Sequence, residues 1–266
     1  MRVSVAGGSG FIGTALVACL REMGAEVAVP DRAALAGGPP PGGWGMMVWA
    51  AGLTADFRQR PLDTVAAHVA DLNAVIGRGG MEGILYLSST RVYQRADRAS
   101  EAAALPCRSE DPSDLYNLTK LTGEALCLSS GVGRVKIARL SNVTGPGEAA
   151  RQTFLGALCR EARAGGITLQ SAPGSLKDYL WIDDAARVLA GMATDDSTGI
   201  LNVAGGRQIA HRDWAVTLAR QAGAALEMPD GLPETTFPPI ETARMCRRYG
   251  PVRIDPLNRA AELLTD

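Results

Sequence analysis

The stretch RVSVAGGSGFIGTALVACLREMG, residues 2–24, decides the fold. Residues 2–6 form an apolar run typical of a buried strand, 7–13 form a glycine-rich turn, and 11–24 predict a helix. A helix that begins directly after such a turn points its free backbone N–H groups at an anion. The stretch therefore predicts a strand–turn–helix unit that holds the pyrophosphate of a dinucleotide.

Strand-type and helical runs alternate after this unit. Further strands are expected at 26–30, 46–52, 83–89 and 135–143, with helices at 63–79 and 114–131 between them. This alternation predicts an α/β fold with a doubly wound parallel sheet, and a dinucleotide-binding domain over residues 1–147. The segment AALAGGPPPGGWG (33–45) is expected to hold neither a full helix nor a strand, because Pro and Gly dominate it.

The pattern is looser from residue 148 onward. Residues 148–266 are expected to form a small C-terminal α/β lobe that binds the substrate and packs over the carboxyl ends of the sheet strands. The strand expected at 200–206 would return from this lobe to the main sheet. The tail after Met228 is rich in proline and gives no clear pattern.

Composition and charge exclude several classes of protein. Of the 266 residues 46% are hydrophobic, so there is enough apolar mass for a core, and disorder is excluded over most of the length. A net charge of -1 and 5% aromatic residues argue against general nucleic-acid binding. The five scattered cysteines, the N-terminal strand and the lack of a long apolar run predict a soluble cytoplasmic protein that binds neither a membrane nor a metal ion.

Two features outside the glycine turn indicate a function: one concerns recognition of the cofactor ribose and the other concerns acid/base catalysis. Asp31 ends the second expected strand, where a carboxylate accepts hydrogen bonds from the adenosine ribose and favours NAD, whereas Arg32 could neutralise the 2′-phosphate of NADP. Tyr116 and Lys120 stand four residues apart on one helix face, and an adjacent ammonium lowers the pKa of a phenol. Such a pair is more often a surface pair, but Ser89 ends an expected strand at the ligand-binding edge of the sheet and could orient a carbonyl toward Tyr116.

Six ordered motifs make nearly the whole chain resemble the extended short-chain dehydrogenases/reductases of the NAD-dependent epimerase/dehydratase group. They are GGSGFIG (7–13), WAAG (49–52), SSTRVY (88–93), YNLTK (116–120), ARLSNVTGPGE (138–148) and KDYLWIDD (177–184). The resemblance implies a Rossmann sheet and a catalytic triad of Ser89, Tyr116 and Lys120. It also implies two sets of binding residues. For NAD(H) or NADP(H) these are Gly7, Ser9, Gly10, Phe11, Ile12, Gly13, Asp31, Arg32, Ala50, Ala51, Gly52 and Lys120; for the substrate they are Ser89, Thr90, Asn142 and Lys177.

The chain also departs from the family pattern. The segment 33–45 replaces the family's third strand and its helix, so the edge unit of the sheet is expected to be missing. Lys177 stands where the family has an arginine that binds the substrate diphosphate, and lysine lacks the bidentate fork. Thr90 and Arg91 follow Ser89 where dehydratases of the group carry Asp and Glu, which disfavours dehydration.

The leading hypothesis is an NAD(P)-dependent oxidoreductase that reduces a keto group, with the 4-keto group of a nucleotide-activated deoxysugar as substrate. In this hypothesis Tyr116 delivers the proton, Ser89 polarises the carbonyl oxygen, and Lys120 biases Tyr116 and binds the ribose. One alternative is a nucleotide-sugar epimerase that uses the same triad, and another is a catalytically silent, dinucleotide-dependent sensor or scaffold. By analogy with the family, helices at 61–77 and 113–130 suggest a homodimer.

Overall fold

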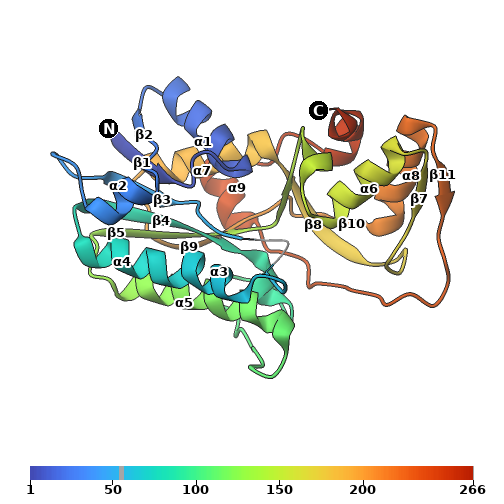
Figure 1. The fold of residues 1–266 in the computed structure, drawn as a ribbon, viewed down its shortest axis with the longest axis horizontal. Helices are drawn as coiled ribbons and strands as arrows, with labels where there is room; N and C mark the ends of the chain where they lie inside the picture. The colour runs from blue at the N-terminus through green and yellow to red at the C-terminus, as the bar shows by residue number, and fades with distance from the viewer. Residues whose placement is uncertain (54–56, 266) are drawn as a thin grey trace.

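The computed structural model describes residues 1–53 and 57–265 and is an α/β protein with one large sheet and two small ones (Figure 1). The large sheet contains β1 (Arg2–Ala6), β2 (Glu26–Ala28), β3 (Gly45–Trp49), β4 (Met81–Ser89), β5 (Arg134–Leu140) and β9 (Gly199–Val203). The small sheets contain β6 (Asn142–Thr144), β8 (Leu176–Trp181) and β10 (Gln208–Ala210), and β7 (Gly166–Thr168) with β11 (Ala225–Glu227).

Nine α-helices are found in the described residues: α1 (Phe11–Glu22), α2 (Arg32–Gly37), α3 (Pro61–Val65), α4 (Asp71–Arg78), α5 (Leu115–Ser129), α6 (Phe154–Arg163), α7 (Ile182–Thr194), α8 (His211–Ala222) and α9 (Ala243–Tyr249). A π-helical turn, η1 (Ala66–Ala70), joins α3 to α4. The 3₁₀ turns are η2 (Thr90–Tyr93), η3 (Pro112–Asp114), η4 (Glu148–Ala150) and η5 (Pro256–Leu264). Within the described ranges, none of the helices is long and apolar enough to cross a bilayer.

The large sheet confirms the doubly wound parallel fold predicted from the sequence. Its strand order is β2-β1-β3-β4-β5-β9, and every pair is parallel. Strand β2 is an edge strand, so in the described part of the chain the additional edge unit of the family is missing, as expected. Strand β9 comes from the C-terminal part of the chain and pairs with β5.

The segment after β2 is more regular than the sequence suggested. A short helix, α2, begins where Asp31 caps it: the Oδ1 atom accepts a hydrogen bond from the Ala34 backbone N–H at 2.8 Å. The alanines of this helix favour it, and it ends before the proline run. The side chain of Trp44, after the proline run, is buried in the core and only 3% exposed. A short loop and this large side chain thus stand where the family has its additional strand and helix.

The strand expected at 135–143 is in fact two strands in two different sheets. Strand β5 ends at Leu140, the Ser141 N–H bonds to the Val203 carbonyl oxygen at 3.0 Å, and β6 then pairs with β8. The β-branched Val143 and Thr144 continue the apolar run of β5 after only Ser141 and Asn142, so the sequence pattern did not reveal the break. The break carries Asn142 out of the large sheet and into the second lobe.

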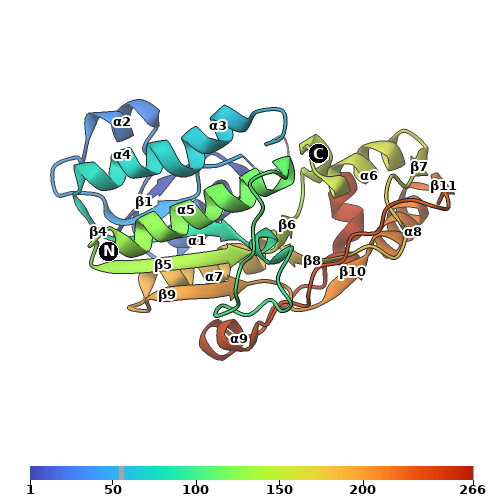
Figure 2. The same cartoon turned by 90° about the horizontal axis from the view of Figure 1, so that it is seen from below.

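Helices cover both faces of the large sheet. Helices α3, α4 and α5 lie on one face, and α1 and α7 lie on the other (Figures 1 and 2). The smaller sheets, with α6 and α8, form a lobe at the carboxyl ends of the large-sheet strands (Figures 1 and 2). Residues far apart in the chain therefore meet at this end of the sheet.

A buried ion pair fixes α5 against the sheet. The Arg139 guanidinium on β5 donates two hydrogen bonds to the Glu124 carboxylate on α5, at 3.0 and 2.7 Å, and both side chains are at most 4% exposed. The Ser88 hydroxyl donates to the same carboxylate. Arg139 also donates to the Tyr93 hydroxyl at 2.9 Å, and Tyr93 donates to Asn202 at 2.7 Å. The network joins α5, β4, β5, β9 and η2. Arg139 is therefore part of a buried ion pair that connects these elements.

Removing one partner of this pair is expected to destabilise the protein strongly. Glu124→Gln leaves the Arg139 charge buried without a counter-ion, which lowers the free energy of unfolding by about 3–5 kcal/mol. The matched control is Glu82→Gln at an exposed pair with Arg134, where the loss is about 0.5 kcal/mol or less. Urea denaturation of both variants measures the difference, and equal losses would contradict the role of the buried pair.

Candidate active site

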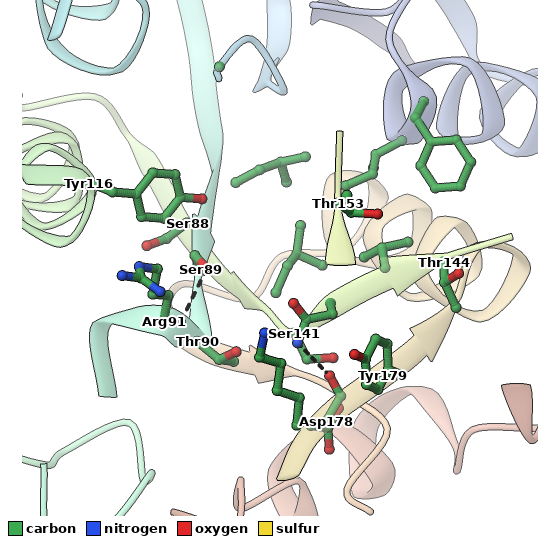
Figure 3. A pocket seen from close by; sticks show the side chains of 18 of the residues that line it. Ser88, Ser89, Thr90, Arg91, Tyr116, Ser141, Thr144, Thr153, Asp178 and Tyr179 are labelled. Carbon is green, nitrogen blue, oxygen red and sulfur yellow. Dashed lines mark hydrogen bonds between the residues drawn. The ribbon is translucent and has the colours of Figure 1, made fainter. Parts of the chain in front are cut away.

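A cavity of about 520 Å³ lies at the carboxyl ends of the large-sheet strands, between the sheet and the second lobe. One end is formed by the glycine turn and the end of β3, the middle by β4, η2 and α5, and the far end by β6, β8 and α6. Of the predicted site residues, Gly10, Phe11, Ile12, Gly13, Ala50, Ala51, Gly52, Ser89, Thr90, Tyr116, Lys120, Asn142 and Lys177 line it. Figure 3 shows part of this lining.

The glycine turn has the shape of a phosphate cradle. Gly7 adopts φ +80°, and a Cβ on it would lie 2.7 Å from the Ala51 backbone nitrogen. A Cβ on Gly13 would lie 2.2 Å from the Gly7 carbonyl oxygen. Gly10 caps α1 without a side chain, so the first N–H groups of the helix face the cavity unshielded. The turn therefore fits the pyrophosphate of a dinucleotide, which would bind along this edge.

The structure brings Ser89, Tyr116 and Lys120 together in the middle of the cavity. Ser89 ends β4, and its Oγ accepts a hydrogen bond from the Arg91 N–H at 3.2 Å. Tyr116, 3% exposed at the start of α5, lies beside Ser89 in the cavity wall (Figure 3). One turn later, the Lys120 Nζ donates to the Leu87 carbonyl oxygen at 2.9 Å and lies 5.8 Å from the Tyr116 ring centroid.

The electrostatics of Tyr116 differ from the sequence expectation. Burial raises the pKa of Tyr116, whereas the neighbouring Ser89 hydroxyl and the charge of Arg91 act to lower it. Burial also lowers the pKa of Lys120 to about 7, against the opposing charge of Glu124. The sequence analysis expected the Lys120 charge to lower the pKa of Tyr116. The pKa is instead raised, because desolvation of the phenol is the largest effect.

Comparisons of the sequence with known proteins identify the family of the chain. A profile described as "NAD dependent epimerase/dehydratase family" matches residues 48–204. The dTDP-6-deoxy-L-talose 4-dehydrogenase (NAD(P)(+)) of Kitasatospora kifunensis is 30% identical over 287 aligned positions, which cover 90% of this chain and 87% of that protein. The chain belongs to the NAD-dependent epimerase/dehydratase family.

Solved structures agree on the fold. MoeE5 in complex with UDP-glucuronic acid and NAD has a TM-score of 0.81 at 21% identity, covering 99% of this chain and 98% of that one. The UDP-glucose 4-epimerase of Thermus thermophilus, in complex with NAD, has a TM-score of 0.77 at 20% identity, with 99% and 98% covered. Family membership confirms that the protein is an NAD(P)-dependent enzyme of the extended short-chain dehydrogenase/reductase type, with NAD(H) or NADP(H) as cofactor.

Four residues predicted to contact the cofactor lie outside the cavity lining: Gly7, Ser9, Asp31 and Arg32. Gly7 shapes the turn from behind, and Ser9 is exposed within it. Asp31 and Arg32 are both exposed beyond the end of β2, and one Asp31 oxygen caps α2. The adenosine end of the family's cofactor site is therefore shallow here.

The end of the cavity opposite the glycine turn is formed by residues at the break after β5 and by β8. The Asn142 Nδ2 donates to the Asp178 carbonyl oxygen at 2.8 Å, which fixes the amide across two strands. Burial lowers the pKa of Lys177, whose Nζ lies 5.4 Å from the Phe154 ring centroid. Asp178 accepts from the Gly205 N–H at 2.8 Å, its second oxygen has no partner among the described residues, and burial raises its pKa to about 6.

The structure also places His68 beside Tyr116, a contact that the sequence analysis did not predict. Its ring lies 5.4 Å from the Tyr116 ring, with Nε2 accepting from the Leu53 N–H and Nδ1 2.9 Å from the Thr119 hydroxyl. Burial and the Lys120 charge lower the pKa of His68 to about 2, so it stays neutral. It connects the loop after β3 to α5. No sequence signal marked it, because the contact depends on how two distant segments pack.

The crowding at Gly13 generates a test of the cofactor cradle. Gly13→Ala would place a methyl group against the Gly7 carbonyl oxygen, so the turn must open, and affinity for the dinucleotide should fall at least about tenfold. The matched control is Gly77→Ala in α4, where a Cβ meets no atom within 4 Å. Calorimetric titration with NADH and NADPH measures both, and unchanged affinity in Gly13→Ala would refute the cradle.

Proposed function

We propose that the protein reduces a keto group with NAD(P)H, and that the group is the 4-keto function of a nucleotide-activated deoxysugar. The observation that carries this proposal is the meeting of Ser89, Tyr116 and Lys120 in one cavity that continues to the glycine turn. The 30% identical relative, named as a 4-dehydrogenase of a dTDP-6-deoxysugar, supports the same reaction class.

In this mechanism the substrate carbonyl oxygen lies between the hydroxyls of Ser89 and Tyr116. Ser89 donates a hydrogen bond that polarises the carbonyl, and Tyr116 transfers its proton to the oxygen as the alcohol forms. The bound dinucleotide supplies the hydride. Lys120 holds the cofactor ribose and places a positive charge one helical turn from Tyr116. The buried position of Tyr116 excludes water from the transfer.

The substrate would lie along the far end of the cavity. Lys177 provides the charge for a diphosphate as a point cation, and the Asn142 amide, fixed by Asp178, lies beside the sugar. Thr90 is buried in the wall next to Ser89. The nucleotide sugars named with the structural neighbours support a nucleotide-linked substrate.

Epimerisation is the second candidate, because a 4-epimerase shares the fold and NAD. It needs the same three side chains, but its cofactor stays bound and is regenerated in each cycle. Dehydration is disfavoured because Thr90 and Arg91 provide no carboxylate next to Ser89.

We also propose a homodimer. Helices α3 and α5 lie side by side and carry exposed apolar side chains. Leu62 is 83% exposed, Leu128 49%, and Val65 and Leu118 are each 37% exposed. Pairing this face with its copy would cover them. Sedimentation velocity that finds only monomer at micromolar concentration contradicts the dimer.

Replacing Tyr116 tests the reaction. Tyr116→Phe removes the proton donor and keeps the ring, so turnover of a dTDP-4-keto-6-deoxysugar with NADPH or NADH should fall by about 10²–10⁴-fold. Tyr249→Phe, at a tyrosine outside the cavity lining, is the control and should keep full activity. Calorimetry should show that both variants bind the dinucleotide as the wild type does. Retained turnover in Tyr116→Phe would refute the assignment.

The same calorimetry separates the substrate classes. Dinucleotide binding that is tightened by UDP or dTDP supports the nucleotide-sugar substrate. Binding that neither diphosphate changes would exclude a nucleotide-linked substrate and leave a smaller carbonyl compound. Protein that is purified with its dinucleotide still bound, and that consumes none during turnover, would favour the epimerase.

A further inference from the structure

Arg91 lies in the cavity wall beside the proposed proton donor and, among the described residues, forms no ion pair. Its guanidinium carbon is 5.4 Å from the Phe57 ring centroid, and the Tyr116 ring is 5.3 Å from the same Phe57 ring. Its backbone N–H holds the Ser89 hydroxyl, and it lines the cavity with both of these residues (Figure 3). The guanidinium is thus on the same wall as the groups that would move the proton.

The hydrogen bonding of Arg91 is incomplete. One terminal nitrogen donates to the Ser113 carbonyl oxygen at 3.3 Å, whereas the buried Nε has no partner among the residues described. Two acids are near enough to act on it, Asp111 and Asp114, but both pair with Arg95. Its charge is therefore directed at the cavity rather than neutralised within the wall.

Lys120 is poorly placed to supply this charge alone. Its ammonium is committed to the Leu87 carbonyl oxygen and lies 5.8 Å from the Tyr116 ring centroid. Burial holds its pKa at about 7, so part of the lysine is neutral at physiological pH. A guanidinium keeps its proton throughout this range. Arg91 is consequently a permanent cation in the cavity wall beside Tyr116, whereas the second guanidinium on the Phe57 ring, that of Arg58, is exposed to solvent.

We propose that Arg91 is a positioning residue that acts through Tyr116: its guanidinium stabilises the phenolate left when Tyr116 gives its proton to the substrate oxygen. The proton moves from the Tyr116 oxygen to the alkoxide oxygen, and solvent later returns a proton to the phenolate. The proposal rests on the proposed role of Tyr116 as proton donor. It adds the Arg91 charge to the charge that Lys120 places near the phenol. An arginine thereby serves a reductase at a position where a dehydratase needs an acid.

Several other titratable or charged groups lie around Tyr116 and Arg91. Around Tyr116 they are His68 on η1, Tyr86 on β4, Ser89, and Lys120 on α5. Around Arg91 they are Arg58 before α3, Asp111 and Asp114 at η3, and Lys177 on β8. The neutral His68 and Tyr86 cannot stabilise a phenolate by charge, and Arg58 is exposed to solvent. Arg91 is the cation expected to matter most.

The direct test is an NMR titration of tyrosines labelled with ¹³C at Cζ, with NAD⁺ bound. The chain has five tyrosines, and the Tyr116 resonance is assigned by its loss in Tyr116→Phe. Arg91→Gln should move the Tyr116 titration midpoint upward by about one pH unit, because a close positive charge is lost. Arg91→Lys should restore most of the shift. The Tyr249 resonance, on α9, should not move.

Arg58→Gln is the matched control, because Arg58 stacks on the same Phe57 ring at 4.6 Å but is exposed. It should move the Tyr116 midpoint by less than about 0.3 pH unit. An unchanged midpoint in Arg91→Gln, or an equal shift in Arg58→Gln, would overturn the proposal. If Tyr116→Phe retains turnover, the proposed function fails instead, and the titration still reports the coupling of Arg91 to Tyr116.

Discussion

The contact between Glu124 and Arg139 holds the site together. Two opposite charges at 4% and 3% side-chain exposure cannot separate without leaving an unpaired ion in a medium of low dielectric constant. Because Glu124 follows Lys120 by one turn of α5, and Ser88 precedes Ser89 on β4, the pair sets the spacing between the helix and the strand that carry the proposed triad. Directional hydrogen bonds fix this spacing more sharply than apolar packing alone would.

The second constraint is the close approach of the glycine turn to β3. Gly7 and Gly13 leave no room for a side chain, so the first turn of α1 faces the cavity from a fixed position. The other end of the cofactor site is less constrained, because β2 is an edge strand and Asp31 is exposed. Within the described residues, a short loop with Trp44 replaces the wall that an additional strand and helix would provide. We therefore expect affinity for the dinucleotide to depend mainly on the residues that line the cavity, and less on Asp31 and Arg32.

The sequence predicted what depends on local pattern and missed what depends on packing. The glycine turn, the strand that ends in Ser89 and the helix with Tyr116 and Lys120 each have a local signal, and the structure places them in one cavity. His68 has no such signal, and the motif that contains Arg91 gave no indication of its contact with Phe57, because a loop and a turn that fold against α5 place both side chains. The same reason explains the undetected break at Ser141 and the raised pKa of Tyr116: both follow from neighbours distant in the chain.

The reaction proposed for this cavity is hydride reduction of a nucleotide-linked 4-keto sugar. The most direct measurement is turnover with dinucleotide deuterated at C4 of the nicotinamide, followed by NMR of the sugar product. We expect deuterium at C4 of the sugar, transferred from one face of the nicotinamide, with one dinucleotide oxidised per product. A product without deuterium, or a changed sugar with no net oxidation of the dinucleotide, would contradict it.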